Sequence, residues 1–145
     1  MAHRPDQSAR FRSTRAAHRD ETAEDYVEAV MQIATERGEA RVTDLARLMG
    51  VTHVTVTRII ARLAREGLVE DRPYKPIELT AKGRRLAARI QSRHETVLGF
   101  LTAIGVPSKQ AEIDAEGIEH HVSDATVRAM RAWMDQGPPQ GRGEH

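Results

Sequence analysis

The fold is decided by residues 42–69, which are VTDLARLMGVTHVTVTRIIARLAREGLV. Apolar residues recur at helical spacing on both sides of Gly50, so this stretch predicts two helices joined by a tight turn. The first helix is short and follows Val42. The second is expected to begin after Thr52, whose hydroxyl can cap its first turn, and to end near Glu66. Two helices at this spacing predict a helix-turn-helix.

The residues that follow predict a wing attached to this motif. Residues 68–72 and 77–80 have the composition of two short strands, and Pro73-Tyr74-Lys75-Pro76 forms a proline-bounded basic tip between them. A helix-turn-helix with a wing predicts binding to double-stranded DNA. Because one such module contacts too few bases for useful specificity, a homodimer on a palindromic site is expected.

The predicted DNA-reading surface lies mainly on the second helix of the motif. Apolar residues occupy one face of this helix, so the others point outward, where they can reach base edges and phosphates in the major groove. The tip of the wing is expected to contact the DNA backbone or the minor groove. The predicted DNA-binding residues are Thr43, Thr52, His53, Val54, Thr55, Thr57, Arg58, Arg62, Tyr74 and Lys75.

Charge is unevenly divided along the chain, although the net charge is only +1. Residues 41–93 contain twelve Lys and Arg against five Asp and Glu, whereas residues 1–40 and 94–145 are both net acidic. A basic middle is what nucleic-acid binding requires, and acidic flanks suit a cation site, although a solvated charged surface would explain the same counts. Since the chain has no Cys, any metal must be bound by oxygen and imidazole.

The other segments complete a mostly α fold. Residues 1–20 hold five arginines and few apolar residues, which predicts a disordered basic arm. The winged helix-turn-helix DNA-binding domain is expected over residues 21–80, beginning with a helix from about Thr22 to Arg37. An all-helical dimerisation domain is expected over residues 81–136, and residues 137–145 predict a disordered tail because they are rich in Gly and Pro.

Three helices are expected in the dimerisation domain. The first is a long helix from Ala81 to about Ile104 that Thr80 caps. The second runs from Ser108 to about His121, and Ser123 caps the third. No stretch is apolar over the roughly 18 residues of a membrane span, and the N-terminus lacks the apolar segment of a secretory signal. A cytoplasmic protein without a membrane partner is therefore expected.

Two short acidic patterns are candidate metal-binding fragments. Asp25 and Glu28 are three residues apart in a predicted helix, so their carboxylates point to the same side. Glu116, Glu119 and His120 stand at positions i, i+3 and i+4 of a later helix and converge on one face. Each fragment by itself also fits a solvated helix face. A like-charged pair such as Glu116 and Glu119 is mildly destabilising, however, and a cation would compensate it.

His94, in the predicted long helix, is the third candidate fragment, although a lone histidine is more often a surface residue than a ligand. The four carboxylates of the three fragments carry four negative charges, which two divalent cations would neutralise. Carboxylates and imidazoles without sulfur form a hard site that suits manganese or ferrous iron better than copper or zinc.

Five runs of residues have a pattern in common with one known family. They are EDYVE at 24–28, GEARVTDLA at 38–46, LTAKG at 79–83, RHE at 93–95 and, most specific of all, DAEGIEHHVS at 114–123. On these residues the sequence resembles the manganese transport regulator branch of the diphtheria toxin repressor family, over residues 24–133. The one departure in the wing is Pro76, where the family commonly has glycine.

The resemblance implies a binuclear Mn²⁺ site, with Fe²⁺ as a second candidate ion. The positions that match the family's ligands are Asp25, Glu28, His94, Glu116, Glu119 and His120. In iron-sensing relatives the positions of Asp25 and Glu119 are methionine and, usually, cysteine, so carboxylates at both favour manganese. The SH3-like third domain of the iron-dependent members is expected to be absent.

The function implied by the resemblance is a manganese-dependent repressor of metal uptake genes. It would bind palindromic operator DNA as a homodimer when metal is bound, with no small organic substrate and no enzymatic activity. Two alternatives stay open at this point. One is a metal-independent winged-helix repressor that responds to an organic effector. The other is a di-metal hydrolase, although the sequence has no Ser-His-Asp candidate and no phosphate-binding glycine loop.

Overall fold

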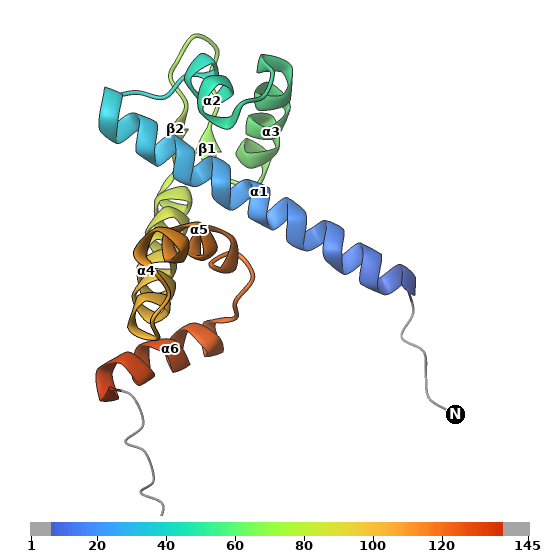
Figure 1. Ribbon diagram of the computed structural model, residues 1–145. Coiled ribbons are helices and arrows are strands. Elements are labelled where there is room, and N and C mark those ends of the chain that lie inside the picture. Colours follow the sequence, from blue (N-terminus) through green and yellow to red (C-terminus); the bar gives the residue numbers. More distant parts are fainter. Residues whose placement is uncertain (1–6, 138–145) are drawn as a thin grey trace, which may run out of the picture. The chain divides into compact units, whose positions relative to one another are not determined.

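The computed structural model describes residues 7–137, which form helices and one small sheet (Figure 1). In chain order the elements are α1 (Gln7–Arg37), α2 (Val42–Met49), α3 (His53–Arg65), β1 (Val69–Glu70), β2 (Glu78–Leu79), α4 (Ala81–Ala103), α5 (Ser108–Ile118) and α6 (Asp124–Gln136). The chain divides into two compact units between Ala88 and Arg89. The prediction of a mostly α fold is confirmed. No described helix is both long and apolar enough to cross a lipid bilayer.

The first unit is a winged helix-turn-helix, as predicted. The C-terminal half of α1 packs against α2 and β2, α2 packs against α3, and α3 packs against β1. The side chains that fill the centre are almost fully buried: Val27, Val30, Leu45, Val56, Ile60 and Leu63. Gly50 has φ 67°, the left-handed conformation that a glycine adopts without strain, and it ends α2 so that the chain can turn into α3.

Hydrogen bonds at the base of the wing fix its position. Strands β1 and β2 are antiparallel, with Val69 opposite Leu79 and Glu70 opposite Glu78. The Thr80 hydroxyl donates to the carbonyl oxygen of Gly67 (2.6 Å) and accepts from the amide of Gly83 (3.1 Å), so it caps α4 and attaches α4 to the end of α3.

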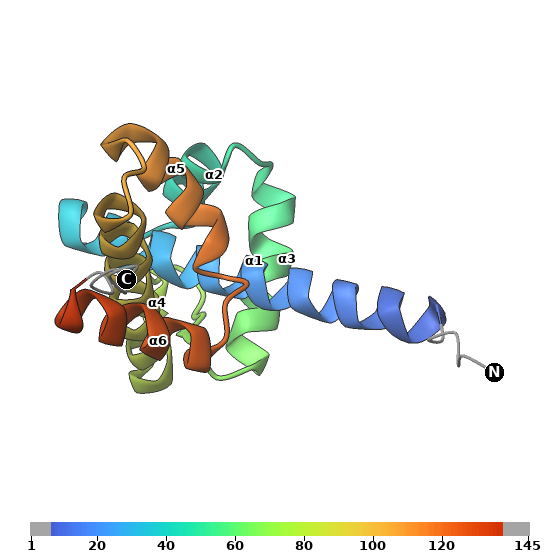
Figure 2. The same cartoon turned by 60° about the horizontal axis from the view of Figure 1, so that its bottom comes forward.

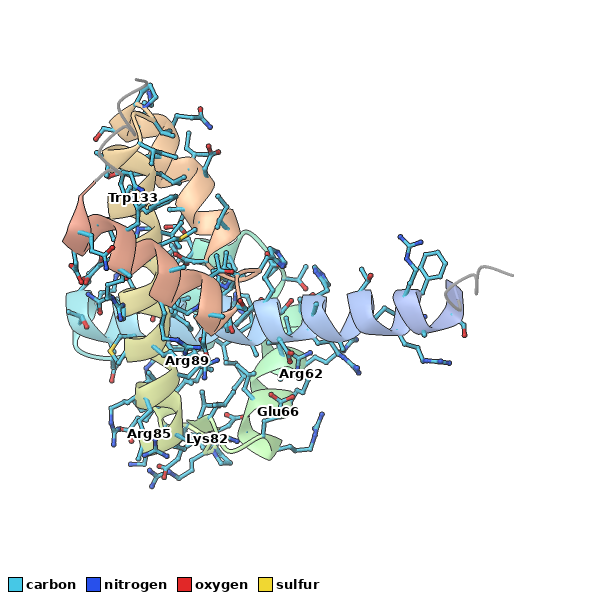
Figure 3. All side chains as sticks on the ribbon, turned by 90° about the horizontal axis from the view of Figure 1, so that it is seen from below. Arg62, Glu66, Lys82, Arg85, Arg89 and Trp133 are labelled. Atoms are coloured by element: carbon cyan, nitrogen blue, oxygen red, sulfur yellow. The ribbon has the colours of Figure 1, made fainter. Side chains whose placement is uncertain are left out.

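The start of α4 also lies very close to the loop that enters the wing. A Cβ atom on Gly83 would lie 2.1 Å from the carbonyl oxygen of Leu68, so only glycine fits at this position. Lys82 Nζ donates to the carbonyl of Glu66 (2.9 Å), a second contact between α4 and the end of α3 (Figure 3). Ala87 belongs to the core of the first unit. Because of this packing, the division between the units follows Ala88, whereas the sequence placed the domain boundary at residues 80 and 81.

The N-terminal segment departs from the predicted disordered arm. Residues 7–20 are the first turns of α1 and extend the helix well before the predicted start at Thr22. These residues contain no Gly or Pro, and Ala and Arg are strong helix formers, so the helix that packs on the core can continue toward the N-terminus without a core of its own. Residues 1–6 of the arm and residues 138–145 of the predicted tail lie outside the described residues.

The second unit contains the rest of α4 together with α5 and α6 (Figure 2). Its buried residues include Ile90 and Val97 of α4, Ala111 and Ala115 of α5, and Val127 of α6. The rings of Phe100 and Trp133 pack edge to face, with centroids 5.4 Å apart and an interplanar angle of 78°.

The limits of α5 and α6 test two further predictions. The Ser123 hydroxyl accepts a hydrogen bond from the Thr126 amide (3.2 Å), as predicted for the cap of α6. The prediction that the preceding helix reaches His121 is wrong, because α5 ends at Ile118 and the His121 amide bonds the Ile118 carbonyl in a tighter turn.

Candidate metal centre and DNA interface

Four of the six predicted metal ligands come together within the second unit. His94 lies in α4, Glu116 lies in the last turn of α5, and Glu119 and His120 lie in the turn that follows. His94 Nδ1 is 2.5 Å from Glu119 Oε2 and 3.9 Å from Glu116 Oε1. His120 Nε2 is 3.5 Å from Glu119 Oε1. Glu119 is therefore the centre of the cluster, with an imidazole nitrogen near each of its carboxylate oxygens.

Burial makes this cluster chemically unusual. Glu119 is only 1 % exposed, and an ionised carboxylate is strongly unfavourable away from water unless cations or hydrogen-bond donors surround it. The cluster contains oxygen and imidazole donors and no sulfur, which is the set that a hard divalent cation such as Mn²⁺ or Fe²⁺ accepts. The residues present thus fit a metal centre of the expected kind.

Arg93 holds the turn that carries Glu119. Its Nε donates to the Glu119 carbonyl (3.0 Å), one Nη donates to the Val122 carbonyl, and the other forms an ion pair with Asp124 Oδ1 (2.7 Å). The Arg93 side chain is only 13 % exposed, so its planar guanidinium is largely shielded from water, and its hydrogen bonds are strong. Arg93 had no predicted role, because nothing in the local sequence pattern places residue 93 beside residues 119–124.

The other two predicted ligands belong to the first unit. Asp25 and Glu28 lie one turn apart on α1, and both are half-buried. Tyr26 and Val27 between them are buried, which fixes the rotation of this part of α1, and burial raises the pKa of Tyr26. The convergence of this pair with the cluster of the second unit stays a prediction.

The exposed face of α3 is the candidate DNA interface. His53, Val54, Thr57 and Arg58 are exposed, and Val54, a large apolar side chain, is 67 % exposed. Thr43, on the first turn of α2, is exposed as well. An apolar side chain on the outer face of a helix-turn-helix can contact the methyl group of thymine, while Thr and Arg can bond base edges and phosphates.

Three of the predicted DNA contacts have a partner within the chain. The Thr52 hydroxyl accepts from the Thr55 amide (3.2 Å) and lies 3.0 Å from the Thr55 hydroxyl, so these two side chains cap α3. Arg62 Nη2 donates to the carbonyl of Arg19 (3.2 Å), and its Nε lies 3.7 Å from Glu66 Oε1 (Figure 3). DNA contacts by these side chains stay predictions, and they would compete with the internal contacts.

The wing tip presents its aromatic side chain to solvent. Tyr74 is 98 % exposed and has φ 60°, a left-handed conformation that is uncommon for a residue other than glycine. The neighbouring Lys75 is exposed, and its amide bonds the Arg72 carbonyl (3.2 Å). Arg72 in turn pairs with Glu70 (2.6 Å), so the charge of the wing stem is partly neutralised while the tip keeps a cation and a ring.

A winged helix-turn-helix followed by a helical unit with a carboxylate and imidazole cluster defines a class, the winged-helix DNA-binding proteins that carry a metal-donor site. Family models match both parts. Residues 20–77 match the N-terminal DNA binding domain of the iron dependent repressors, and residues 80–137 match their metal binding and dimerisation domain. The chain belongs to this family, the iron-dependent repressors, whose members are transcriptional regulators and not enzymes.

Individual relatives agree with this assignment. The chain is 46% identical over 126 residues to the transcriptional regulator MntR of Escherichia coli, which covers 87% of this chain and 81% of that one. It is 37% identical over 100 residues to the HTH-type transcriptional regulator MntR of Bacillus subtilis, covering 69% and 70%. The family resemblance inferred from the sequence is thereby confirmed, and the hydrolase alternative is set aside.

Solved structures of similar fold include a manganese-dependent transcriptional repressor in complex with manganese. It is 30% identical, with a TM-score of 0.68, and the match covers 79% of this chain and 53% of that one. The repressor ScaR with bound Zn²⁺ is 26% identical, with a TM-score of 0.69, covering 79% and 54%. The chain thus spans about half the length of these solved structures.

Proposed function

We propose that the chain is a manganese-responsive repressor that binds palindromic operator DNA in the cytoplasm as a homodimer and loses affinity for DNA when its metal is removed. The observation that carries this proposal is the buried cluster around Glu119, in a chain whose first unit is a winged helix-turn-helix. The names of the Escherichia coli and Bacillus subtilis relatives, and the manganese complex of a structural neighbour, support manganese as the ion. Genes for metal uptake are the proposed targets.

The proposed ligand set combines residues of both units: Asp25, Glu28, His94, Glu116, Glu119 and His120. Four carboxylates balance two divalent cations, which supports two ions per subunit. Carboxylates at positions 25 and 119 favour Mn²⁺, with Fe²⁺ as the competing ion.

When bound, the metal supplies the positive charge that the clustered carboxylates need. The chain's own residues explain how this would affect DNA binding. Asp25 and Glu28 belong to α1, which packs against α2, whereas Glu119 belongs to the second unit. Ligation by both units therefore favours the conformations in which the two sets of donors are close, and a ligand that binds one conformation better shifts the population toward it.

A homodimer is supported by the family match of the second unit. Residues 80–137 match the metal binding and dimerisation domain of the iron dependent repressors. Ile104, just after α4, and Ile113 of α5 are large apolar side chains in this range that are more than half exposed and therefore accessible to a second copy. A two-fold dimer would present two α3 helices to successive turns of the major groove, which explains the expectation of a palindromic operator.

The test is a fluorescence-anisotropy titration of operator DNA, selected by the wild-type chain from a random library, with Mn²⁺ or with a chelator present. We expect Mn²⁺ to tighten binding by more than about tenfold, within the usual range of coupling between two sites. Glu119→Ala is expected to abolish this gain. Glu112→Ala removes an exposed carboxylate from α5, seven residues before Glu119, and is expected to retain the gain. Equal affinity of the wild-type chain in Mn²⁺ and in chelator would contradict the proposal.

A further inference from the structure

The first turns of α1 extend beyond the rest of the first unit as a basic helix. Figures 1 and 2 show this part of α1 projecting past α3. Residues 8–19 contain four arginines, one histidine and no acidic residue. Apart from the intermediate Ala16, the residues in this range whose side chains are described are exposed. We call residues 8–19 the basic helix.

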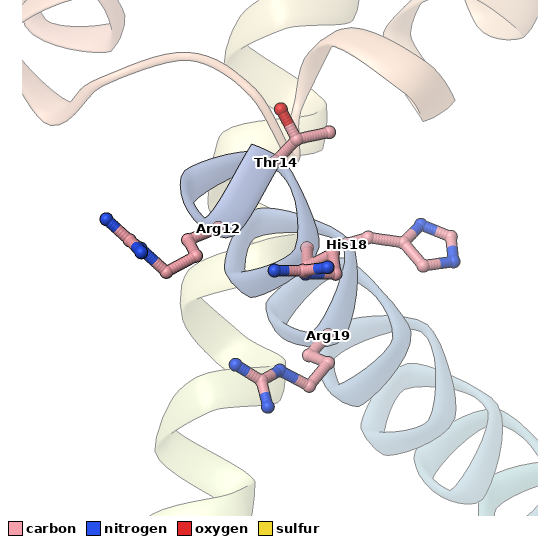
Figure 4. Close-up of a pocket in the computed structure, with 5 residues that line it drawn as sticks. Arg12, Thr14, His18 and Arg19 are labelled. Carbon is pink, nitrogen blue, oxygen red and sulfur yellow. The ribbon is translucent and has the colours of Figure 1, made fainter. Parts of the chain in front are cut away.

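Three of the arginines form a stripe on one face of the helix. Arg12, Arg15 and Arg19 are separated by three and four residues, which places them within about 60° of one another at 3.6 residues per turn. Figure 4 shows Arg12 and Arg19 on one side of α1 and His18 on the opposite side. The acidic residues that follow, from Asp20 to Asp25, lie outside this stripe when their positions around the helix axis are calculated at the same 3.6 residues per turn.

The arginine stripe faces the same way as the buried side of α1. Arg19 and Tyr26 are seven residues apart, and Arg15 and Tyr26 are eleven apart, so both arginines lie within about 20° of Tyr26 around the helix axis. Tyr26 is 3 % exposed in the core of the helix-turn-helix. The stripe is therefore on the side of α1 that carries α2 and α3.

A direct contact joins the basic helix to α3. The guanidinium of Arg62, in the last turns of α3, donates to the carbonyl of Arg19 (3.2 Å), and Arg62 also lies 3.7 Å from Glu66. This contact holds the C-terminal end of the basic helix beside α3, the predicted recognition helix. From Arg19 toward Ser8 the basic helix extends about 17 Å away from this contact, at 1.5 Å per residue.

We propose that the basic helix is an additional DNA-binding surface, which contacts phosphates outside the base pairs that α3 reads. This inference rests on the proposed function as a DNA-binding repressor. Arginine pairs with phosphate through two parallel hydrogen bonds, and a row of arginines next to a recognition helix matches the negative charge of the duplex. A length of about 17 Å corresponds to about five base pairs of duplex, at the spacing of the phosphates along one strand.

The chemistry of the segment disfavours other partners. Phe11 is its only large apolar residue, so it lacks the repeated apolar positions of a coiled coil with a second copy of the chain. A membrane-surface helix needs a broad apolar face opposite its cations, which this segment also lacks. Nucleic acid is the partner that requires only positive charge and polar groups.

The test compares two operator duplexes with one double variant and one matched control. The operator, selected by the wild-type chain from a random library, is used at its minimal length and with ten added base pairs on each side. Arg15→Ala with Arg19→Ala removes two charges and keeps strong helix formers. Lys109→Ala with Arg128→Ala removes two exposed charges from the second unit and is the control. Circular dichroism checks that each variant keeps the helix content of the wild type.

We expect the Arg15 and Arg19 double variant to bind the extended duplex about 30-fold more weakly per chain at 0.15 M salt, and therefore about 900-fold more weakly as a homodimer, since affinity scales with salt to a power of about −0.9 for each phosphate contact and each chain loses two. The salt dependence of log affinity should become shallower by about 1.8 per chain. Binding to the minimal duplex and the response to Mn²⁺ should stay unchanged.

If the Arg15 and Arg19 double variant bound the extended duplex with the affinity and the salt dependence of the wild type, the inference would be wrong. The same would follow if the Lys109 and Arg128 control lost as much affinity, or if the double variant changed the oligomeric state instead of DNA binding. Failure of the wild-type chain to bind the minimal duplex would instead overturn the proposed function.

Discussion

Replacement of Arg93 by lysine tests how the metal cluster is held in place. Lysine keeps the charge but has one compact donor group, so it cannot reach the Glu119 carbonyl, the Val122 carbonyl and Asp124 at once. The ion pair with the exposed Asp124 adds little in water, so the effect comes mainly from the two carbonyl bonds. Lysine would leave one of these two carbonyls without its hydrogen bond and only partly solvated. The free energy of unfolding of the variant should therefore be lower by about 1.5–3 kcal/mol.

The effect on metal binding should be larger than the effect on folding. Arg93 positions the backbone of Glu119, the residue at the centre of the cluster, and loss of a group that orients a ligand typically lowers metal affinity about 10–100-fold. Isothermal titration with Mn²⁺ measures this change. Arg89→Lys is the matched control, because Arg89 is an exposed arginine one turn earlier on α4. Wild-type Mn²⁺ affinity in Arg93→Lys would mean that Arg93 does not orient Glu119 for metal binding.

Three further variants test the contacts that position α3 and the wing, which carry the predicted DNA-reading surface. Gly83→Ala would force a Cβ to within 2.1 Å of the Leu68 carbonyl, so we expect a loss of more than about 3 kcal/mol in urea unfolding, and wild-type stability would contradict this packing. Thr52→Ala removes the cap of α3 and should lower the free energy of unfolding by about 1 kcal/mol in the same assay, whereas no loss would mean that the cap contributes nothing. Tyr74→Gly relieves a left-handed conformation and should leave stability equal or higher by up to about 1 kcal/mol. The same change should weaken operator binding measured by anisotropy, and unchanged binding would exclude a contact at the wing tip.

The parts of the fold that were predictable from sequence have strong local signals. The helix-turn-helix and the wing follow from apolar spacing, from Gly50 and from the hydroxyl caps at Thr52 and Thr80. Each of these signals acts within a few residues of the chain. The basic helix was missed because its composition is that of a solvated segment, and its helical state depends on continuity with the packed half of α1.

The candidate metal centre was predictable in part. The spacing of Glu116, Glu119 and His120 predicted one shared helical face, and Glu119 has helical dihedral angles (φ −56°, ψ −29°) although it follows the last residue of α5. The proximity of His94 to this turn depends on how α5 folds back onto α4, which local periodicity does not contain; only the family resemblance pointed to it. The role of Arg93 depends on the same tertiary arrangement and was therefore missed.

Diffraction at the manganese absorption edge, from crystals of the full chain grown with Mn²⁺, shows whether both units supply ligands to the metal. We expect two anomalous peaks per subunit, with ligands that include Asp25 or Glu28 of the first unit as well as Glu119 of the second. Peaks coordinated by one unit alone, or no peak near Glu119, would contradict this expectation.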